Sequence, residues 1–154
     1  MSITKLNNLS ISAVTALPSG VGGKVLQVVQ GTSSTDANTS SSTFVTTPLT
    51  ASITPSSASS KILIIASWTM ENDTSAAAFD FDRSGTLVSG ASDGIFRQQG
   101  TGANHGMCMS FLDSPNTTSS RTYSLFYKRT SVGGTVYFVA SPCKTSIILM
   151  EIGA

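Results

Sequence analysis

The most constraining feature of this chain of 154 residues is a series of short segments in which apolar and polar side chains alternate. In residues 121–129, Tyr123, Leu125 and Tyr127 fall on one side of an extended chain, and a period of two is typical of a strand with one buried face. Clusters of Ser, Gly, Asn and Pro separate such segments at the spacing found in β-sandwiches. The pattern predicts strands at residues 24–30, 43–53, 61–69, 77–83, 86–89, 94–98, 106–112, 121–129, 135–140 and 145–152.

We therefore expect an all-β fold, an antiparallel β-sandwich of jelly-roll-like type with a short extended N-terminal arm. A chain of this length suits one domain with a substantial core. The expected domain spans residues 23–154, and residues 1–22 form the arm, which joins the domain through a stretch rich in Pro and Gly. The side chains expected largely inside the sandwich are Val25, Ile62, Ile64, Trp68, Phe111, Leu125, Phe138 and Leu149.

Two of the expected strands, at residues 62–66 and 147–152, are apolar on both faces. Such a strand needs cover on both sides, either from the second sheet plus a loop or from a neighbouring subunit. Charged residues make up only 11% of the chain, so few ionic groups would lose their hydration when two such faces meet. The sequence therefore favours a stable closed oligomer, which also protects exposed strand edges.

Polar stretches separate the strands. Residues 31–42 hold no apolar side chain larger than that of alanine, so burial cannot repay the entropy lost on ordering them. We expect an exposed loop there, and two further polar connectors at residues 55–60 and 114–120.

Charge and hydropathy argue against two classes of partner. The net charge is +1 and the nine Lys and Arg residues are scattered along the chain, so no stripe that could neutralise phosphates is predicted and no nucleic acid is expected. No apolar run approaches the roughly 20 residues that cross a bilayer, and residues 1–17 lack the apolar centre of a secretory signal. We expect no membrane partner and assembly in a cytoplasm.

No metal site, cofactor or disulfide framework is predicted. His105, Cys108 and Cys143 could be imagined around zinc, but a structural zinc site takes four ligands and no fourth is marked. We interpret the two thiols as small buried hydrophobic groups. The alternative is a single disulfide bond between them.

Catalytic residues are also not apparent. Asp80 and Asp82 alternate along an expected strand and would point the same way, as in a glycosidase pair or a cation site. We interpret them instead as part of a solvated strand face with Arg83 as a partner. Serine is abundant, but the chain has no Gly-x-Ser-x-Gly motif and no second histidine, so we expect a protein that is not an enzyme.

The N-terminal arm carries spaced apolar residues in an otherwise polar segment. They are too sparse to build a core of their own, but they could seat in pockets of a partner or along a neighbouring chain. The predicted partner-binding residues are Ile3, Leu6, Leu9, Ile11, Val14 and Leu17.

Four segments carry a resemblance to a known family: residues 23–30 (GKVLQVVQ), 49–63 (LTASITPSSASSKIL), 111–115 (FLDSP) and 147–152 (IILMEI). In this order they resemble a β module common in structural proteins of tailed phages, especially aquatic ones. The resemblance covers residues 23–154. It implies a protein on the virion surface, commonly a homotrimer, and it transfers no catalytic residue.

Three functions of different classes follow as hypotheses. The first is a capsid decoration or cement protein, or a short head fibre, whose arm grips the major capsid protein or another virion protein. The second is the tip of a tail fibre that recognises host surface glycans, and the third is a carbohydrate-active or esterase-like enzyme. The short arm favours the first, because tail fibres usually carry a long shaft between attachment and tip.

Overall fold

A computed structural model describes residues 24–73, 75–99 and 102–153. The predicted arm at residues 1–22, with all six of its predicted partner-binding side chains, lies outside the described residues. Gly23 and Ala154, the first and last residues of the predicted domain, also lie outside them.

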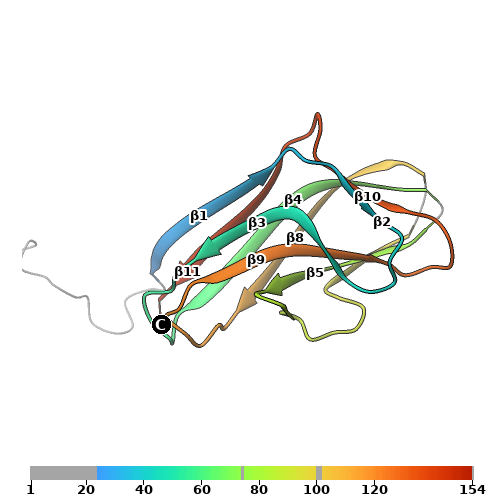
Figure 1. Cartoon of the computed structure of the whole chain (residues 1–154). Helices are drawn as coiled ribbons and strands as arrows, with labels where there is room; N and C mark the ends of the chain where they lie inside the picture. The colour runs from blue at the N-terminus through green and yellow to red at the C-terminus, as the bar shows by residue number, and fades with distance from the viewer. Residues whose placement is uncertain (1–23, 74, 100–101, 154) are drawn as a thin grey trace, which may run out of the picture.

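The described chain is built from strands, so the predicted all-β class is confirmed (Figure 1). The strands are β1 (Val25–Ser33), β2 (Ala37–Thr39), β3 (Val45–Ile53), β4 (Lys61–Asn72), β5 (Ala77–Arg83), β6 (Thr86–Leu87), β7 (Phe96–Gln98), β8 (Asn104–Asp113), β9 (Arg121–Arg129), β10 (Val136–Val139) and β11 (Thr145–Ile152). All ten predicted strands have a counterpart among them, because Ser, Gly and Pro clusters stop each pairing segment where the alternation ends.

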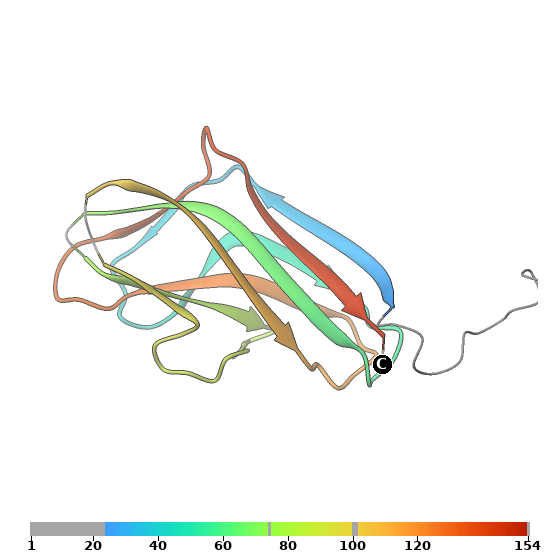
Figure 2. The same ribbon diagram turned by 180° about the vertical axis from the view of Figure 1, so that it is seen from behind.

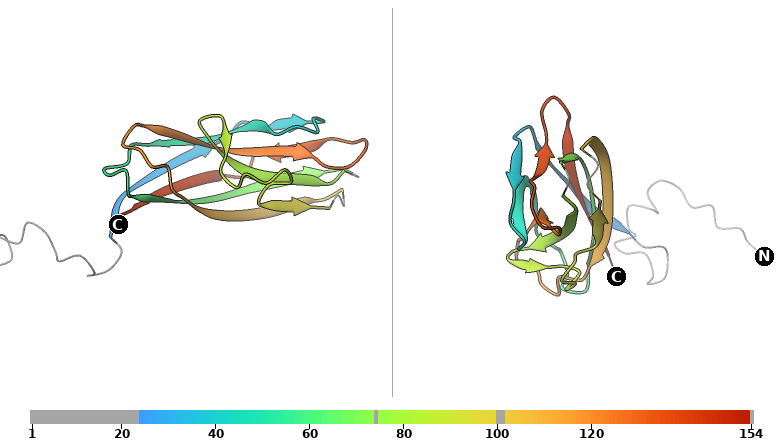
Figure 3. Two further views of the ribbon diagram at one scale, coloured as in Figure 1. Left: turned by 90° about the horizontal axis from the view of Figure 1, so that it is seen from below. Right: turned by 90° about the vertical axis from the view of Figure 1, so that its right-hand side faces the viewer.

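The strands form two antiparallel sheets that pack face to face as the two layers of a sandwich (Figure 3). The first sheet has the order β1-β11-β4-β8, and β10 with β2 continues it beside the far end of β4. The second sheet has the order β3-β9-β5, with β6 and β7 pairing with β5. The chain passes back and forth between the sheets in the order of a jelly roll, as the sequence predicts.

The core lies between the two layers and consists of side chains that point inward from both sheets. Its largest fully buried members are Tyr123, Tyr127, Phe79, Phe81, Phe138, Leu49, Ile53, Ile62, Ile64, Met70, Leu125 and Ile147. Of the eight predicted core residues, six are buried: Ile62, Ile64, Trp68, Leu125, Phe138 and Leu149. Phe111 is only partly buried against this core.

The prediction for Val25 is wrong, since its side chain is 51% exposed. The register between β1 and β11 shifts between Val25 and Gln27, and a bulge of this kind reverses which face a residue occupies. Sequence alternation alone does not reveal such a shift.

The prediction of an exposed loop at residues 31–42 is wrong in part. β1 continues to Ser33, and the short strand β2 pairs with β10, which in turn pairs with β4. These residues are polar because they lie at a sheet margin, and the pairing partner of β2 lies about a hundred positions further along the chain. Backbone pairing supplies order here that side-chain burial does not.

Two buried carboxylates fasten the sandwich near the end where β1 begins and β11 finishes. Asp113 accepts hydrogen bonds from Arg83 at 2.7 and 2.8 Å and from the phenol of Tyr123 at 2.6 Å, which joins the first sheet to the second. Glu151 accepts hydrogen bonds from Gln27 at 2.6 Å and from Ser56 at 2.7 Å. The segments that carry the sequence resemblance therefore meet at this one end.

Candidate functional site

The outer face of the first sheet carries an unusual row of apolar side chains. In register across β1, β11, β4 and β8, Val28 pairs with Met150, Met150 with Leu63, and Leu63 with Leu112. The next row contributes Ile148 and Ile65. Figure 2 shows these four strands side by side. We call this surface the apolar face; it consists of Val28, Leu63, Ile65, Leu112, Ile148 and Met150.

These side chains point away from the core, because the alternating positions on the same strands, such as Ile64 and Leu149, are fully buried. Val28 is 57% exposed and Leu112 49%, while the other four are half-buried. On one side of the apolar face the next paired positions are polar and uncharged, for example Ser67 and Ser146, whose hydroxyls lie 3.1 Å apart. On the other side, Ile152 pairs with the exposed Lys61. The prediction that residues 62–66 and 147–152 leave apolar side chains on a second face is therefore confirmed.

The same face reaches an open sheet edge. Among the described residues, β1 pairs only with β11, so its other side is an edge, and its sequence VLQVVQGTS holds neither a charge nor a proline. Charges, prolines and short length are the usual devices that stop such an edge from pairing with another chain. A long neutral edge beside an apolar face is typical of a surface that another protein covers.

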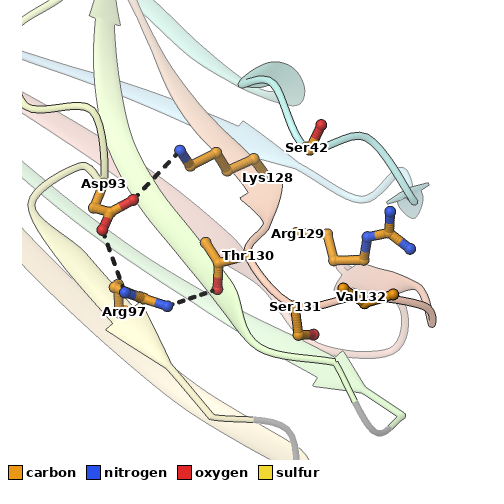
Figure 4. A pocket seen from close by; sticks show the side chains of 8 residues that line it. All are labelled: Ser42, Asp93, Arg97, Lys128, Arg129, Thr130, Ser131 and Val132. Carbon is orange, nitrogen blue, oxygen red and sulfur yellow. Dashed lines mark hydrogen bonds and ion pairs between the residues drawn. The ribbon is translucent and has the colours of Figure 1, made fainter.

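A second candidate site is a pocket of about 500 Å³ at the other end of the sandwich, away from the start of β1 (Figure 4). β9 is nine residues long, so its last residue lies about 30 Å from the end where the strand begins. The pocket brings together the end of β9 with the loop that follows it, the β6–β7 connector with β7, and the connector before β3. Its lining residues are Ser42, Asp93, Arg97, Lys128, Arg129, Thr130, Ser131 and Val132.

Charged side chains are concentrated in this pocket. Asp93 lies between two cations, with Arg97 Nη1 at 3.2 Å from Oδ2 and Lys128 Nζ at 3.6 Å from Oδ1. Arg97 also donates to the hydroxyl of Thr130 at 3.3 Å. Arg129 donates to the carbonyl of Gly134 at 3.4 Å. Three cations against one carboxylate leave an excess of two positive charges among the lining side chains.

The prediction for Asp80 and Asp82 is wrong, because both are buried instead of lying on a solvated face. The connector after β5 folds back over the outer side of that strand. Its Ser89 hydroxyl donates to Asp80, and its Gly85 backbone amide donates to Asp82 at 2.9 Å. Burial raises the pKa of Asp80, but no substrate could reach a carboxyl that is fully enclosed. The two carboxylates hold the connector in place.

The interpretation of the two cysteines as buried groups is also wrong. Cys108 and Cys143 are both exposed and are not bridged. Cys108 lies on the outer side of β8, opposite Ser67, where alternation turns it away from the core. In the part of the chain that the structure describes, no group of three or more His, Cys, Asp or Glu side chains could hold a metal ion.

Within the same described ranges, no helix is long and apolar enough to cross a membrane. No protein-family model matches the chain, and a search among curated proteins likewise finds no match. The resemblance to phage structural modules therefore stays a prediction, and the function has to be argued from the apolar face and the pocket.

The sequence indicated the first of these surfaces and missed the second. The two strands that are apolar on both faces indicated a second face that needs cover. That Val28 and Leu112 extend this face into a row follows only from the register of the strands. The pocket residues come from four separated segments, so the nine Lys and Arg residues looked evenly scattered along the chain. The adjacent cations Lys128 and Arg129 at the end of an expected strand were the one local signal of that pocket.

Proposed function

We propose that this chain is a non-enzymatic structural protein of a tailed-phage virion, either a capsid decoration or cement protein or a short head fibre. In this proposal it forms a homotrimer on the virion surface, and residues 1–22 anchor it to the major capsid protein or to another virion protein. The observation that carries the proposal is the apolar face, because a contiguous apolar surface on a folded domain marks a contact with other protein. The resemblance in sequence to modules of tailed phages is the reason for proposing a phage virion as the particle.

Other copies of the same chain are the partner that fits the apolar face best. The six side chains of the face are uncharged, and Lys61 is the one charged residue in the adjoining paired rows, so a strongly charged partner would find little to complement it. A second copy offers the same uncharged apolar surface, and contacts between identical subunits are more apolar than contacts between transient partners. A closed ring of copies also covers the neutral edge of β1, which an open surface would leave available for uncontrolled pairing.

The layout of the chain is compatible with attachment at one end. The backbone amide of Gly153 donates to the carbonyl of Lys24 at 2.9 Å, so the first and last described residues lie together. The described chain therefore begins and ends at the end of the sandwich opposite the pocket. In the proposal the apolar residues of the N-terminal arm, more than its one lysine, supply the binding energy, because hot spots are buried and isolated surface charges contribute little.

The test is incorporation into particles. Replacing Leu6, Leu9 and Ile11 together by serine should abolish incorporation, as quantified by mass spectrometry of purified virions, while the thermal midpoint of the free protein stays nearly unchanged. Lys5→Ser, in the same arm, serves as the control and should be incorporated at the wild-type level. Full occupancy by the triple variant would move the anchoring role from the arm to the sandwich.

The second candidate function is the receptor-binding tip of a tail fibre that recognises host surface glycans. The pocket favours it, because a polar cavity at the end away from the arm is where a receptor would be met. A cryo-EM map of the whole particle separates the two candidates. Density for the chain on the capsid lattice supports the first, and density at the distal end of a tail fibre supports the second.

A further inference from the structure

The pocket at the end of β9 differs from the rest of the surface in charge. Three of the nine Lys and Arg residues in the chain line it, together with a single carboxylate, in a protein whose net charge is only +1. Ser42, Thr130 and Ser131 also line the pocket and contribute hydroxyl groups. Such a lining offers hydrogen-bond donors and positive charge to a ligand that carries negative charge.

The cationic groups are held in position before any ligand arrives. The ammonium group of Lys128 donates to the carbonyl of Ser92 and lies 4.8 Å from the centre of the Phe44 ring, and its side chain is only 13% exposed. Arg97 pairs with Asp93 on one side and donates to Thr130 on the other (Figure 4). Side chains that are already ordered lose less entropy when they bind, so this arrangement favours recognition of a small anion.

The chemistry of the lining selects among ligand classes. The planar guanidinium of arginine matches the geometry of carboxylate and phosphate groups, which it can bind through two parallel hydrogen bonds. None of the lining residues is aromatic, so the pocket lacks the flat apolar surface on which an uncharged sugar ring would stack. Its volume of about 500 Å³ falls within the range of pockets that hold small molecules.

We propose that this pocket binds the carboxylate or phosphate group of an acidic saccharide. Asp93 occupies the position between Arg97 and Lys128 in the absence of ligand, and the hydroxyls of the lining face the sugar ring. This inference goes beyond the proposed assembly function, because it concerns the opposite end of the sandwich and holds whether the chain sits on a capsid or on a fibre.

A nucleic acid is the other source of phosphate that the cations could meet. Binding along a nucleic-acid backbone requires a track of several cations, and the lining has one compact group of three instead. The observations therefore favour a saccharide, and a nucleic acid becomes an outcome of the test.

The experiment is a ligand-observed NMR titration of the full-length protein at low salt with D-glucuronate, glucose 6-phosphate, inorganic phosphate, D-glucose and a single-stranded oligonucleotide. We expect D-glucuronate or glucose 6-phosphate to bind, and to bind more tightly than inorganic phosphate, while D-glucose does not bind. Whichever of the two acidic sugars binds more tightly identifies the anion as carboxylate or phosphate.

Two variants test whether binding takes place in the pocket. Arg97→Gln and Lys128→Gln should each weaken binding of the acidic sugar about tenfold, the loss of one charge-assisted contact. Lys144→Gln makes the same charge change at an exposed loop outside the pocket and should leave binding unchanged. Arg97 is half exposed, so its variant stays informative even if Lys128→Gln fails to fold.

Three results would overturn the inference. The first is equal binding of D-glucose and the acidic sugars, and the second is tighter binding of the oligonucleotide than of either acidic sugar. The third is an affinity for acidic sugars that drops as much in Lys144→Gln as in Arg97→Gln, which would show a general effect of charge instead of a site.

Discussion

The phenol of Tyr123 donates a 2.6 Å hydrogen bond to Oδ2 of Asp113, and this contact ties β9 of the second sheet to the end of β8 in the first. Tyr123 is fully buried and Asp113 is 6% exposed. Burial, followed by the bond to Asp113, raises the pKa of Tyr123, so the phenol stays protonated and donates throughout the ordinary pH range. The guanidinium of Arg83 pairs with the same carboxylate and compensates the negative charge of Asp113 inside the protein.

Tyr123→Phe removes this contact without creating a cavity. A hydrogen bond to a charged group contributes about 1.5–3 kcal/mol, so we expect the free energy of unfolding to fall by about that amount. Urea denaturation measures it. The control is Tyr137→Phe on β10, where the ring is 38% exposed and a change below about 0.5 kcal/mol is expected. Equal effects of the two changes would refute the role assigned to the Tyr123 phenol.

Gly31 in β1 tests how closely the two sheets approach. A Cβ atom at this position would lie 2.0 Å from the carbonyl oxygen of Thr50 and 3.0 Å from Ile147, and backbone cannot move aside cheaply. We expect Gly31→Ala to lower the free energy of unfolding by about 1–3 kcal/mol, the usual cost of overpacking.

Gly106 in β8 is the matched control, because a Cβ atom added there would have no neighbouring atom within 4 Å and the backbone at this residue is not left-handed. Gly106→Ala should be neutral or slightly stabilising, since alanine restricts the unfolded chain more than glycine does. Thermal denaturation of both variants compares them directly. A tolerated alanine at Gly31 would mean that β1 and β3 are further apart than described.

Acid should weaken the end of the sandwich that Glu151 fastens. Burial alone would raise the pKa of Glu151, but hydrogen bonds from Gln27 and Ser56 outweigh it and lower the pKa to about 2. The folded state therefore binds fewer protons than the unfolded state, in which the pKa is near 4.5. The contribution of Glu151 to stability is complete above pH 4.5 and is lost as the pH falls toward about 2.

Urea midpoints measured across this pH interval check the linkage. The midpoint of the wild-type protein should fall more steeply with decreasing pH than that of Glu151→Gln, which lacks the titrating group. Glu71→Gln, at an exposed position of β4, should keep the wild-type slope. Parallel slopes for the wild type and Glu151→Gln would show that another group carries the acid sensitivity.

Much of the sandwich could be predicted from the sequence, because strands with one buried face leave a period of two that turn residues interrupt. Leu125 was placed correctly for this reason. The errors arise where a partner distant in sequence decides the outcome. Asp80 is buried by a connector that folds over its strand, and β2 is ordered by pairing with β10.

The candidate sites depend even more on such distant relationships. The row across the apolar face requires the register of four strands, although the doubly apolar segments indicated a second apolar face that needs cover. The pocket requires Asp93, Arg97 and Lys128 to converge from separate segments, and the adjacent cations at the end of β9 are the one local sign of that meeting. Local periodicity therefore gave the strands, and only the three-dimensional arrangement gave the pocket.

The apolar face is the basis of the assembly proposal, so placing charge on it should prevent assembly. Val28→Glu and Leu112→Glu together would require two carboxylates to lose their hydration at the contact, which is costly without a partner charge. Both positions are about half exposed in the single chain, so the sandwich itself should fold. Val132→Glu makes the same kind of change at a fully exposed position of the pocket loop and is the control.

Sedimentation equilibrium of the full-length protein at micromolar concentration tests the central claim most directly. The account predicts a mass of three times the 15.9 kDa chain for the wild type and for Val132→Glu, and the mass of a single chain for the Val28→Glu, Leu112→Glu double variant. A single-chain mass for the wild type, or a trimer that survives both changes on the apolar face, would contradict it.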